Sequence, residues 1–354
     1  MRSPLRRFAP ALALAGAAAL PGCAALDLLS ELFGLNLLGI LPDPGFSSEG
    51  PGRGRVKVAL GSLDESGFPL PPKGDAIEVE SPNSDVTVDD WTEKPGFDAG
   101  SFLLLVDGSG SLEADASLCV GCPTDGERHR VEAAATISRA LLDCAPDWRL
   151  GLAEFGDYRG EGNRLVTDIL SPMGSTAATI AQDAESLISD GGTPLWDGVD
   201  EALTLVARDA KDHGPTADSP TDTWGRALVV LSDGADTTSR TTVDAVIAKA
   251  QDKGVTVHVV GLGAASDTVD FGSDPVAVES LRRLASETGG FYATVSDAAD
   301  LPPLGKDIAR AHCGGYAEYG LTWSNPPAAG ERVTGVIRLK DKPTVAVPFA
   351  FTAP

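Results

Sequence analysis

One stretch of the chain decides the fold: Ser101-Phe102-Leu103-Leu104-Leu105-Val106-Asp107-Gly108-Ser109-Gly110-Ser111. It opens as an unbroken apolar run, which predicts a strand buried on both faces of a parallel sheet. The run then breaks into an acid, glycines and hydroxyls, and the glycines let the backbone turn sharply. We therefore expect Asp107, Ser109 and Ser111 to gather at the carboxyl end of the strand, where open α/β sheets place their ligand sites.

Two later stretches supply the same kinds of oxygen atoms. Gly191-Gly192-Thr193-Pro194-Leu195 offers a hydroxyl on a glycine-rich loop, and Leu228-Val229-Val230-Leu231-Ser232-Asp233-Gly234 is again a buried strand that ends in an acid and a glycine. Carboxylate and hydroxyl oxygens are hard ligands that suit Mg²⁺ or Mn²⁺ and are poor for zinc or copper. Turn and capping residues around an empty site produce similar local patterns, but three such elements in this order favour a metal site.

Strands and helices alternate from residue 97 to residue 313, which is typical of a parallel sheet with helices on both faces. The predicted fold is an α/β, doubly wound and mostly parallel sheet. Apolar spacing predicts helices at 131–142, 177–188, 197–207, 243–250, 276–288 and 304–311, and further strands at 148–155, 255–261 and 291–294.

The order Asp-x-Ser-x-Ser, Gly-Gly-Thr and Ser-Asp-Gly resembles the metal-ion-dependent adhesion site of von Willebrand factor type A domains. In that family the serines and the threonine bind the ion directly or nearly so. The aspartates bind it directly or through water, and a carboxylate of a partner often fills the open position. The resemblance implies a site for Mg²⁺ or Mn²⁺, with Ca²⁺ as an alternative, and no member of the pattern is missing. Its members here are Asp107, Ser109, Ser111, Thr193 and Asp233.

Both flanks of this domain contain short strand-like pieces punctuated by prolines and glycines. Neither the amino-terminal flank, 54–96, nor the carboxyl-terminal flank, 314–354, has enough strands to bury a core by itself. We expect the two flanks to combine into one small β-sandwich, with the α/β domain inserted between them. This layout also resembles that of some bacterial proteins with a type A domain. The pieces lie at 56–60, 77–79, 86–88, 319–323, 333–339 and 345–349.

The amino terminus is typical of an export signal. A basic region with three arginines precedes an apolar stretch at 9–20 that is short for a membrane span. Leu20-Pro21-Gly22-Cys23 follows and resembles a bacterial lipoprotein cleavage box, although its proline departs from the usual residue. We therefore expect 1–22 to be a lipoprotein signal peptide and Cys23 to carry lipid. The exported protein is then held in the bacterial cell envelope, at the outer membrane or the cell surface.

The segment 23–53 is predicted to be a membrane-proximal tether. Its leucine-rich part, 26–41, suits a helix that lies along the membrane surface or on a partner. The same part suits packing within the fold itself equally well. Prolines and glycines at 42–52 predict a linker.

The remaining cysteines are Cys119, Cys122, Cys144 and Cys313. They are an even number in a chain predicted to be exported, which indicates disulfides, and three pairings are open. In the family that the chain resembles, the first and last helices are neighbours, and Cys144 and Cys313 close those helices here. The resemblance thus implies a Cys144–Cys313 bridge and leaves Cys119–Cys122 as a small loop. A redox Cys-x-x-Cys motif and a zinc site are the weaker alternatives.

The chain departs from the family pattern at 112–128, which intervenes between the second serine and the first helix. This insertion carries four acids and the Cys119/Cys122 pair. An insertion beside an ion site is placed to touch a partner or to shield the ion. A disulfide-pinned surface loop is the alternative interpretation.

Composition and motifs restrict the function. The net charge of −23, from 51 acidic and 28 basic residues, argues against a nucleic-acid partner, because binding to phosphates needs positive charge. The chain lacks a Gly-x-Ser-x-Gly elbow, a His-Glu-x-x-His motif and a phosphate-binding loop. We therefore expect that the protein is not an enzyme. The first hypothesis is a binding module whose ion holds an acidic side chain of a protein partner. The alternatives are an envelope scaffold with a structural ion and, third, a metal-dependent hydrolase.

Overall fold

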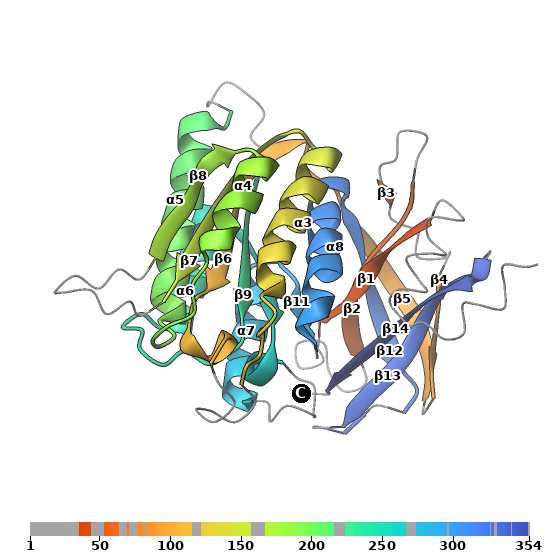
Figure 1. The fold of residues 1–354 in the computed structure, drawn as a ribbon. Helices are drawn as coiled ribbons and strands as arrows, with labels where there is room; N and C mark the ends of the chain where they lie inside the picture. The colour runs from red at the N-terminus through yellow and green to blue at the C-terminus, as the bar shows by residue number, and fades with distance from the viewer. Residues whose placement is uncertain are drawn as a thin grey trace, which may run out of the picture.

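The computed structural model contains two sheets (Figure 1). One has six strands and is covered by helices, and the other has eight antiparallel strands from both ends of the chain. Within the described residues, no helix is long and apolar enough to cross a membrane. The structure describes residues 35–43, 53–63, 69–70, 77–82, 84–114, 122–156, 167–215, 224–266, 274–295, 297–325, 327–328, 331–340 and 342–352.

The six-stranded sheet consists of β6 (Ala99–Asp107), β7 (Asp147–Phe155), β8 (Thr167–Ser175), β9 (Trp224–Ser232), β10 (Thr256–Gly261) and β11 (Tyr292–Thr294). Its strand order is β11-β10-β9-β6-β7-β8. Neighbouring strands are parallel except β7 and β8, which pair antiparallel. The predicted class, α/β with a mostly parallel sheet, is confirmed.

Helices cover both faces of this sheet, as Figure 1 shows. The three that share a core on the face turned to the viewer are α3 (His129–Cys144), α4 (Ala177–Asp183) and α8 (Leu301–Gly314). The opposite face is covered by α5 (Leu195–His213), α6 (Val243–Lys253) and α7 (Pro275–Glu287).

Alternate side chains of β6 enter these two cores. Phe102, Leu104 and Val106 pack on the side of α3 and α8, whereas Leu103 and Leu105 pack on the side of α5. All five side chains are buried. Successive side chains of a strand point to opposite faces, so a strand covered on both faces must be apolar throughout. Burial on both faces therefore explains the unbroken apolar run at 102–106.

Strand β8 is the element of the six-stranded sheet that the sequence did not predict. It contains Pro172 and Gly174, which both weaken a strand signal. β8 lies at the edge of the sheet, where a proline is tolerated because one side of the strand needs no hydrogen-bond donors. The helix predicted at 177–188 is shorter than expected: α4 ends at Asp183, and a 3₁₀ turn follows at Ala184–Ser186.

The second sheet interleaves strands from the two flanks. Its order is β1-β2-β12-β5-β4-β13-β14, with β3 beside β2. The flanks thus combine into one antiparallel unit, as expected, and β5 joins its two parts because it pairs with both β12 and β4. Its end strands β1 and β14 contact each other. The strands are β1 (Leu35–Asp43), β2 (Arg53–Leu63), β3 (Pro69–Leu70), β4 (Ile77–Ser81), β5 (Ser84–Lys94), β12 (Tyr316–Trp323), β13 (Arg332–Leu339) and β14 (Lys342–Thr352).

Strand β1 belongs to the segment 23–53, for which the sequence predicted a tether. It pairs antiparallel with β2 along its length. Part of the leucine-rich stretch therefore packs within the fold, which was one of the two interpretations open from the sequence. The predicted signal peptide 1–22, Cys23 and the rest of the stretch before Leu35 lie outside the described residues.

The α/β domain leaves and re-enters the antiparallel sheet at one place. Lys94 at the end of β5 is paired with Tyr316 at the start of β12. The N–H of Phe97 donates to the carbonyl of His312 at 3.3 Å. A Cβ atom on Gly96 would lie 1.9 Å from the carbonyl oxygen of Cys313, so the two crossing segments touch and only glycine fits there.

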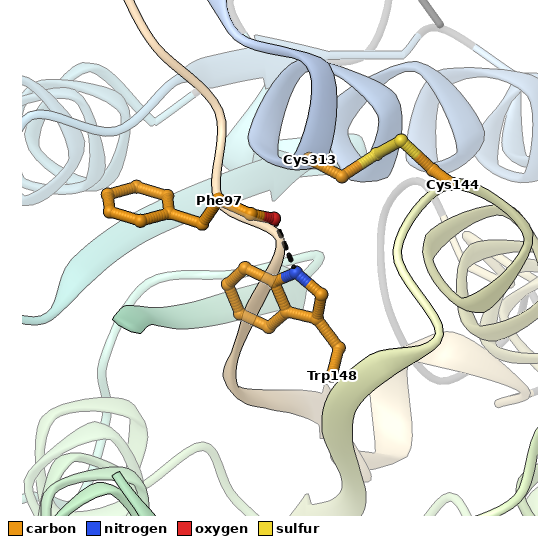
Figure 2. Close-up of a disulfide and its surroundings, with 4 residues drawn as sticks. All are labelled: Phe97, Cys144, Trp148 and Cys313. Atoms are coloured by element: carbon orange, nitrogen blue, oxygen red, sulfur yellow. Dashed lines mark hydrogen bonds between the residues drawn. A yellow bond between two sulfur atoms is a disulfide. The ribbon is translucent and has the colours of Figure 1, made fainter. Parts of the chain in front are cut away.

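A disulfide and a tryptophan close the domain beside this crossing (Figure 2). Cys144 and Cys313 are joined, with Cα atoms 6.2 Å apart, and the bridge links the carboxyl ends of α3 and α8. The indole N–H of Trp148 donates to the carbonyl of Phe97 at 2.9 Å. Cys122 is also disulfide-bonded, whereas Cys119, its expected partner, lies outside the described residues.

His312 is enclosed next to the same crossing. Its ring lies 4.9 Å from that of Trp148 and 5.6 Å from that of Phe97. Nδ1 of His312 lies 3.4 Å from Nε2 of His258, and Nδ1 of His258 accepts the N–H of Phe291. His258 therefore donates to His312, and Nε2 of His312 has no partner among the described residues. Burial lowers the pKa of His312 from 6.5 to about 4.

We expect this histidine to destabilise the domain in acid. The unfolded chain takes up a proton near pH 6.5, whereas the folded chain does so only near pH 4. The free energy of unfolding therefore keeps its full value above pH 6.5. Protonation of this histidine in the unfolded chain lowers it by up to about 3 kcal/mol as the pH drops to 4. The measurement is urea unfolding of wild type and His312→Gln between pH 7.5 and 4.5.

The variant should lose less stability over this interval, because Gln does not titrate. His213→Gln is the matched control, since that side chain is 46% exposed, and its pH profile should follow wild type. Parallel profiles for wild type and His312→Gln contradict the prediction.

Candidate functional site

Asp107 and Asp233 lie at the carboxyl ends of two neighbouring parallel strands. Asp107 is the last residue of β6, and Asp233 directly follows β9. The two strands are paired up to Val106 and Leu231. From β6 the chain proceeds to β7 on one side and later returns to β9 on the other side. The gap between β6 and β9 is therefore a topological switch point, where open α/β sheets bind ligands.

Both carboxylate oxygens of Asp107 accept hydrogen bonds. Oδ1 accepts the backbone N–H of Ser109 at 2.8 Å, and Oδ2 accepts the hydroxyl of Ser232 at 2.6 Å. The side chain is 1% exposed. The turn after Asp107 passes so close to β7 that a Cβ on Gly108 would lie 2.8 Å from Oε1 of Glu154. A side chain at this position would displace the carboxylate of Glu154.

The carboxylate of Asp233 faces the two serine hydroxyls. Its Oδ1 accepts the hydroxyl of Ser111 at 2.9 Å and that of Ser109 at 3.4 Å. The two serine oxygens are 3.2 Å apart. Oδ2 of Asp233 accepts the hydroxyl of Thr124, and the side chain is 2% exposed. Hydroxyl oxygens from the turn after β6 and from the insertion thus both contact the carboxylate that follows β9.

Thr193 lies on a loop that is bound to both of these strands' ends. Gly110 donates its N–H to the carbonyl of Gly191 at 3.1 Å. The N–H of Thr193 donates to Oγ1 of Thr237, and the N–H of Thr237 donates back to the carbonyl of Thr193. No hydrogen bond among the described residues uses the Thr193 hydroxyl. This oxygen is therefore available to a ligand.

Burial governs the electrostatics of the site. Burial and the charge of Asp233 raise the pKa of Asp107 from 3.8 to about 7, although hydrogen bonds from Ser232 and Ser109 oppose the shift. Burial also raises the pKa of Asp233, against the hydrogen bond from Thr124 and others. Burial next to each other thus destabilises the charged forms of these two carboxylates. A divalent cation beside them favours the charged form of both, so these residues fit a cation.

The contacts join two carboxylates with the hydroxyls of Ser109 and Ser111, and the loop that carries Thr193 is hydrogen-bonded to the same turn. Such a set suits Mg²⁺, Mn²⁺ or Ca²⁺. In the described part of the chain, no cluster of three or more His, Cys, Asp or Glu side chains is arranged to hold a metal. The hydroxyl-rich site at the ends of β6 and β9 is therefore the one to test.

Two residues of this region were missed by the sequence reasoning. Glu154 on β7 is 2% exposed, and its Oε1 accepts the N–H of Ile188 at 2.6 Å, which fixes the approach to the Gly-Gly-Thr loop. An acid inside the apolar end of a strand was the signal that could have found it. Thr124 lies in the polar insertion, and nothing in its local sequence distinguishes it from other loop residues.

Comparison with known families identifies the domain. Residues 103–307 match the von Willebrand factor type A domain, and this is more than half of the chain. The chain belongs to the von Willebrand factor type A domain family. The match covers the end of β6 that carries Asp107, the whole of β9 and the Gly-Gly-Thr loop between them. No curated protein matches the sequence.

Several solved structures are similar to this von Willebrand factor type A chain at low identity. One, von Willebrand factor type A from Catenulispora acidiphila, is 13% identical over 78% of this chain and 75% of that chain, with a TM-score of 0.43. The von Willebrand factor domain of a type V pili tip protein from Porphyromonas gingivalis is 14% identical over 62% and 95%, with a TM-score of 0.40. Proximal thread matrix protein 1 from the mussel byssus, with a zinc-occupied MIDAS motif, is 12% identical over 62% and 50%, with a TM-score of 0.38.

Proposed function

We propose that the von Willebrand factor type A domain of this protein binds a divalent cation and uses it to hold an acidic side chain of a protein partner. The proposal depends on one observation above all. Asp107 and Asp233 are both buried side by side at the switch point, together with the hydroxyls of Ser109 and Ser111. Burial of neighbouring carboxylates destabilises their charged forms, and a cation reverses this effect.

We assign roles to the five residues. The oxygens of Ser109, Ser111 and Thr193 would hold the ion, with Asp107 and Asp233 beside them to balance its charge. Mg²⁺ and Mn²⁺ fit this set, with Ca²⁺ as an alternative. Such an ion keeps exchangeable water when the protein does not fill every ligand position, and a carboxylate of a partner replaces that water. The chain's own residues supply position and charge, and no reaction is proposed.

The protein is further proposed to act in the bacterial cell envelope. The basic and apolar segment 1–22 and the cleavage box that ends at Cys23 support export and attachment through lipid. The net charge of −23 opposes a nucleic-acid partner. A scaffold in which the ion only ties loops together is the alternative, and the two proposals differ in whether a partner needs the ion.

A thermal melt of the purified protein with and without Mg²⁺ or Mn²⁺ tests the cation site. A ligand that binds only the folded state raises the midpoint, by an amount that corresponds to about 2.7 kcal/mol at a hundred times Kd. We expect a rise in wild type and none in Asp107→Ala. The exposed Asp143→Ala is the matched control and should respond as wild type does. An equal rise in Asp107→Ala places the ion elsewhere.

Metal-dependent capture tests the partner. Wild type and Asp107→Ala are immobilised, exposed to an envelope extract in Mg²⁺, and then eluted with EDTA. We expect a protein that is retained by wild type alone and is released by the chelator. Partner binding that persists in excess EDTA contradicts the role of the ion. A site variant that loses stability but still binds the partner supports the scaffold.

A further inference from the structure

Each site carboxylate accepts a hydroxyl on its Oδ2 atom, the oxygen that is not bonded to the serine loop. For Asp107 this is Ser232, which is bonded to Oδ2. For Asp233 it is Thr124, also bonded to Oδ2. Ser232 belongs to the strand that carries the site, but Thr124 comes from the return of the insertion 112–128. The insertion therefore contributes a side chain to the geometry of the site.

Thr124 is positioned by backbone hydrogen bonds to the serine loop itself. Its N–H donates to the carbonyl of Ser111 at 3.3 Å, and the next N–H, of Asp125, donates to the carbonyl of Leu112 at 2.9 Å. The return of the insertion, residues 122–128, thus runs beside the residues that end the Asp-x-Ser-x-Ser motif. A shift of this return moves Thr124 and Ser111 together.

A buried ion pair holds the other side of the return. The carboxylate of Asp125 accepts the N–H groups of His129 and Arg130 at the start of α3. It also lies 2.9 Å from Nη1 of Arg130. Arg130 is 1% exposed and contacts Glu113 at the outgoing end of the insertion as well. Both ends of the insertion are therefore tied to one buried guanidinium, and Thr124 sits directly beside that anchor.

The loop after β10 leaves room for Thr124. A Cβ atom on Gly263 would lie 2.6 Å from Cγ2 of Thr124, so any side chain at this position would displace the side chain of the threonine. Thr124 and Gly263 also line a cavity of about 490 Å³. An isosteric change at Thr124 therefore alters its hydrogen bond without overfilling a packed core.

We propose that Thr124 is a positioning residue of the cation site: its hydroxyl fixes Oδ2 of Asp233 so that Oδ1 stays aimed at the serine hydroxyls. This inference rests on the cation site of the proposed function and assigns part of its affinity to the insertion. Groups that orient a metal ligand through a hydrogen bond change metal affinity by roughly 10- to 100-fold when they are removed. Cation binding at the site and the position of the insertion's return are thereby coupled. A bound cation favours the position in which Thr124 contacts Asp233, and that position in turn favours cation binding.

Isothermal titration with Mn²⁺ tests the inference on four proteins: wild type, Thr124→Val, Thr124→Ser and the control Thr204→Val. Thr204 is exposed and its hydroxyl bonds within its own helix. We expect Thr124→Val to raise Kd by about tenfold, and Thr124→Ser and Thr204→Val to stay near wild type. The melting midpoint without metal should change little in Thr124→Val, which separates positioning from a loss of fold.

The outcomes separate this inference from the proposal on which it rests. Wild-type affinity in Thr124→Val overturns the inference and leaves the cation site intact. A Thr124→Ser variant as weak as Thr124→Val also overturns it, because the serine retains the hydroxyl. No binding of Mn²⁺ by wild type overturns the cation site and this inference with it.

Discussion

The Cys144→Ser/Cys313→Ser double variant is expected to unfold with a free energy about 5 kcal/mol below that of wild type, on the chain-entropy account of disulfides. The bridge spans a sequence separation of 169 residues, so its removal releases a long loop in the unfolded chain. It closes the part of the α/β domain that runs from the end of α3 to the end of α8. Denaturant unfolding under oxidising conditions measures the difference.

Reductant supplies the matched control for this variant. Wild type in reductant should fall to the stability that the double variant has in the same reductant. Reductant should lower the double variant itself only by the contribution of the disulfide at Cys122. Equal stability of wild type and double variant in oxidising buffer contradicts the prediction. We also expect reduction to change Mn²⁺ affinity, because the bridge restrains α8 against α3. Equal affinity in both redox states contradicts that restraint.

The Arg130→Met variant is expected to lose about 3–5 kcal/mol, the range for removal of one partner of a buried ion pair. Arg130 and Asp125 are both 1% exposed, and their charged groups lie 2.9 Å apart. Methionine fills a similar volume but leaves the carboxylate of Asp125 buried without its cation. The guanidinium also donates to the carbonyl of Ile188 at 3.3 Å, so the loop before Gly-Gly-Thr loses a contact too. Urea unfolding at neutral pH is the measurement.

Two further variants test the cause of this loss. Arg283→Met removes a partly exposed guanidinium that pairs with Asp244 and Glu287, and such surface pairs contribute only about 1 kcal/mol or less. Asp125→Asn added to Arg130→Met removes the unpaired charge and should recover part of the loss. A loss for Arg130→Met no larger than that for Arg283→Met would show that the buried pair contributes little.

Much of the fold is encoded in local pattern. The apolar run of β6 predicts a strand covered on both faces, and helical spacing predicts the helices on either side. These signals are strong because burial on both faces removes polar residues from the strand. Strand β8 escaped prediction because an edge strand tolerates Pro172 and Gly174. Strand β1 remained ambiguous because leucines in a polar chain suit a membrane surface, a partner or a core equally.

The sequence by itself placed Asp107 and Asp233 each at the end of a buried strand, and it placed Thr193 on a glycine-rich loop. Only the tertiary structure decided that β6 and β9 are neighbours across a switch point, which brings Asp107 and Asp233 together. It also decided that Thr124 reaches Asp233 and that Arg130 anchors the insertion. Strand order and loop return depend on contacts between residues far apart in the chain, and no local pattern of residues carries that information.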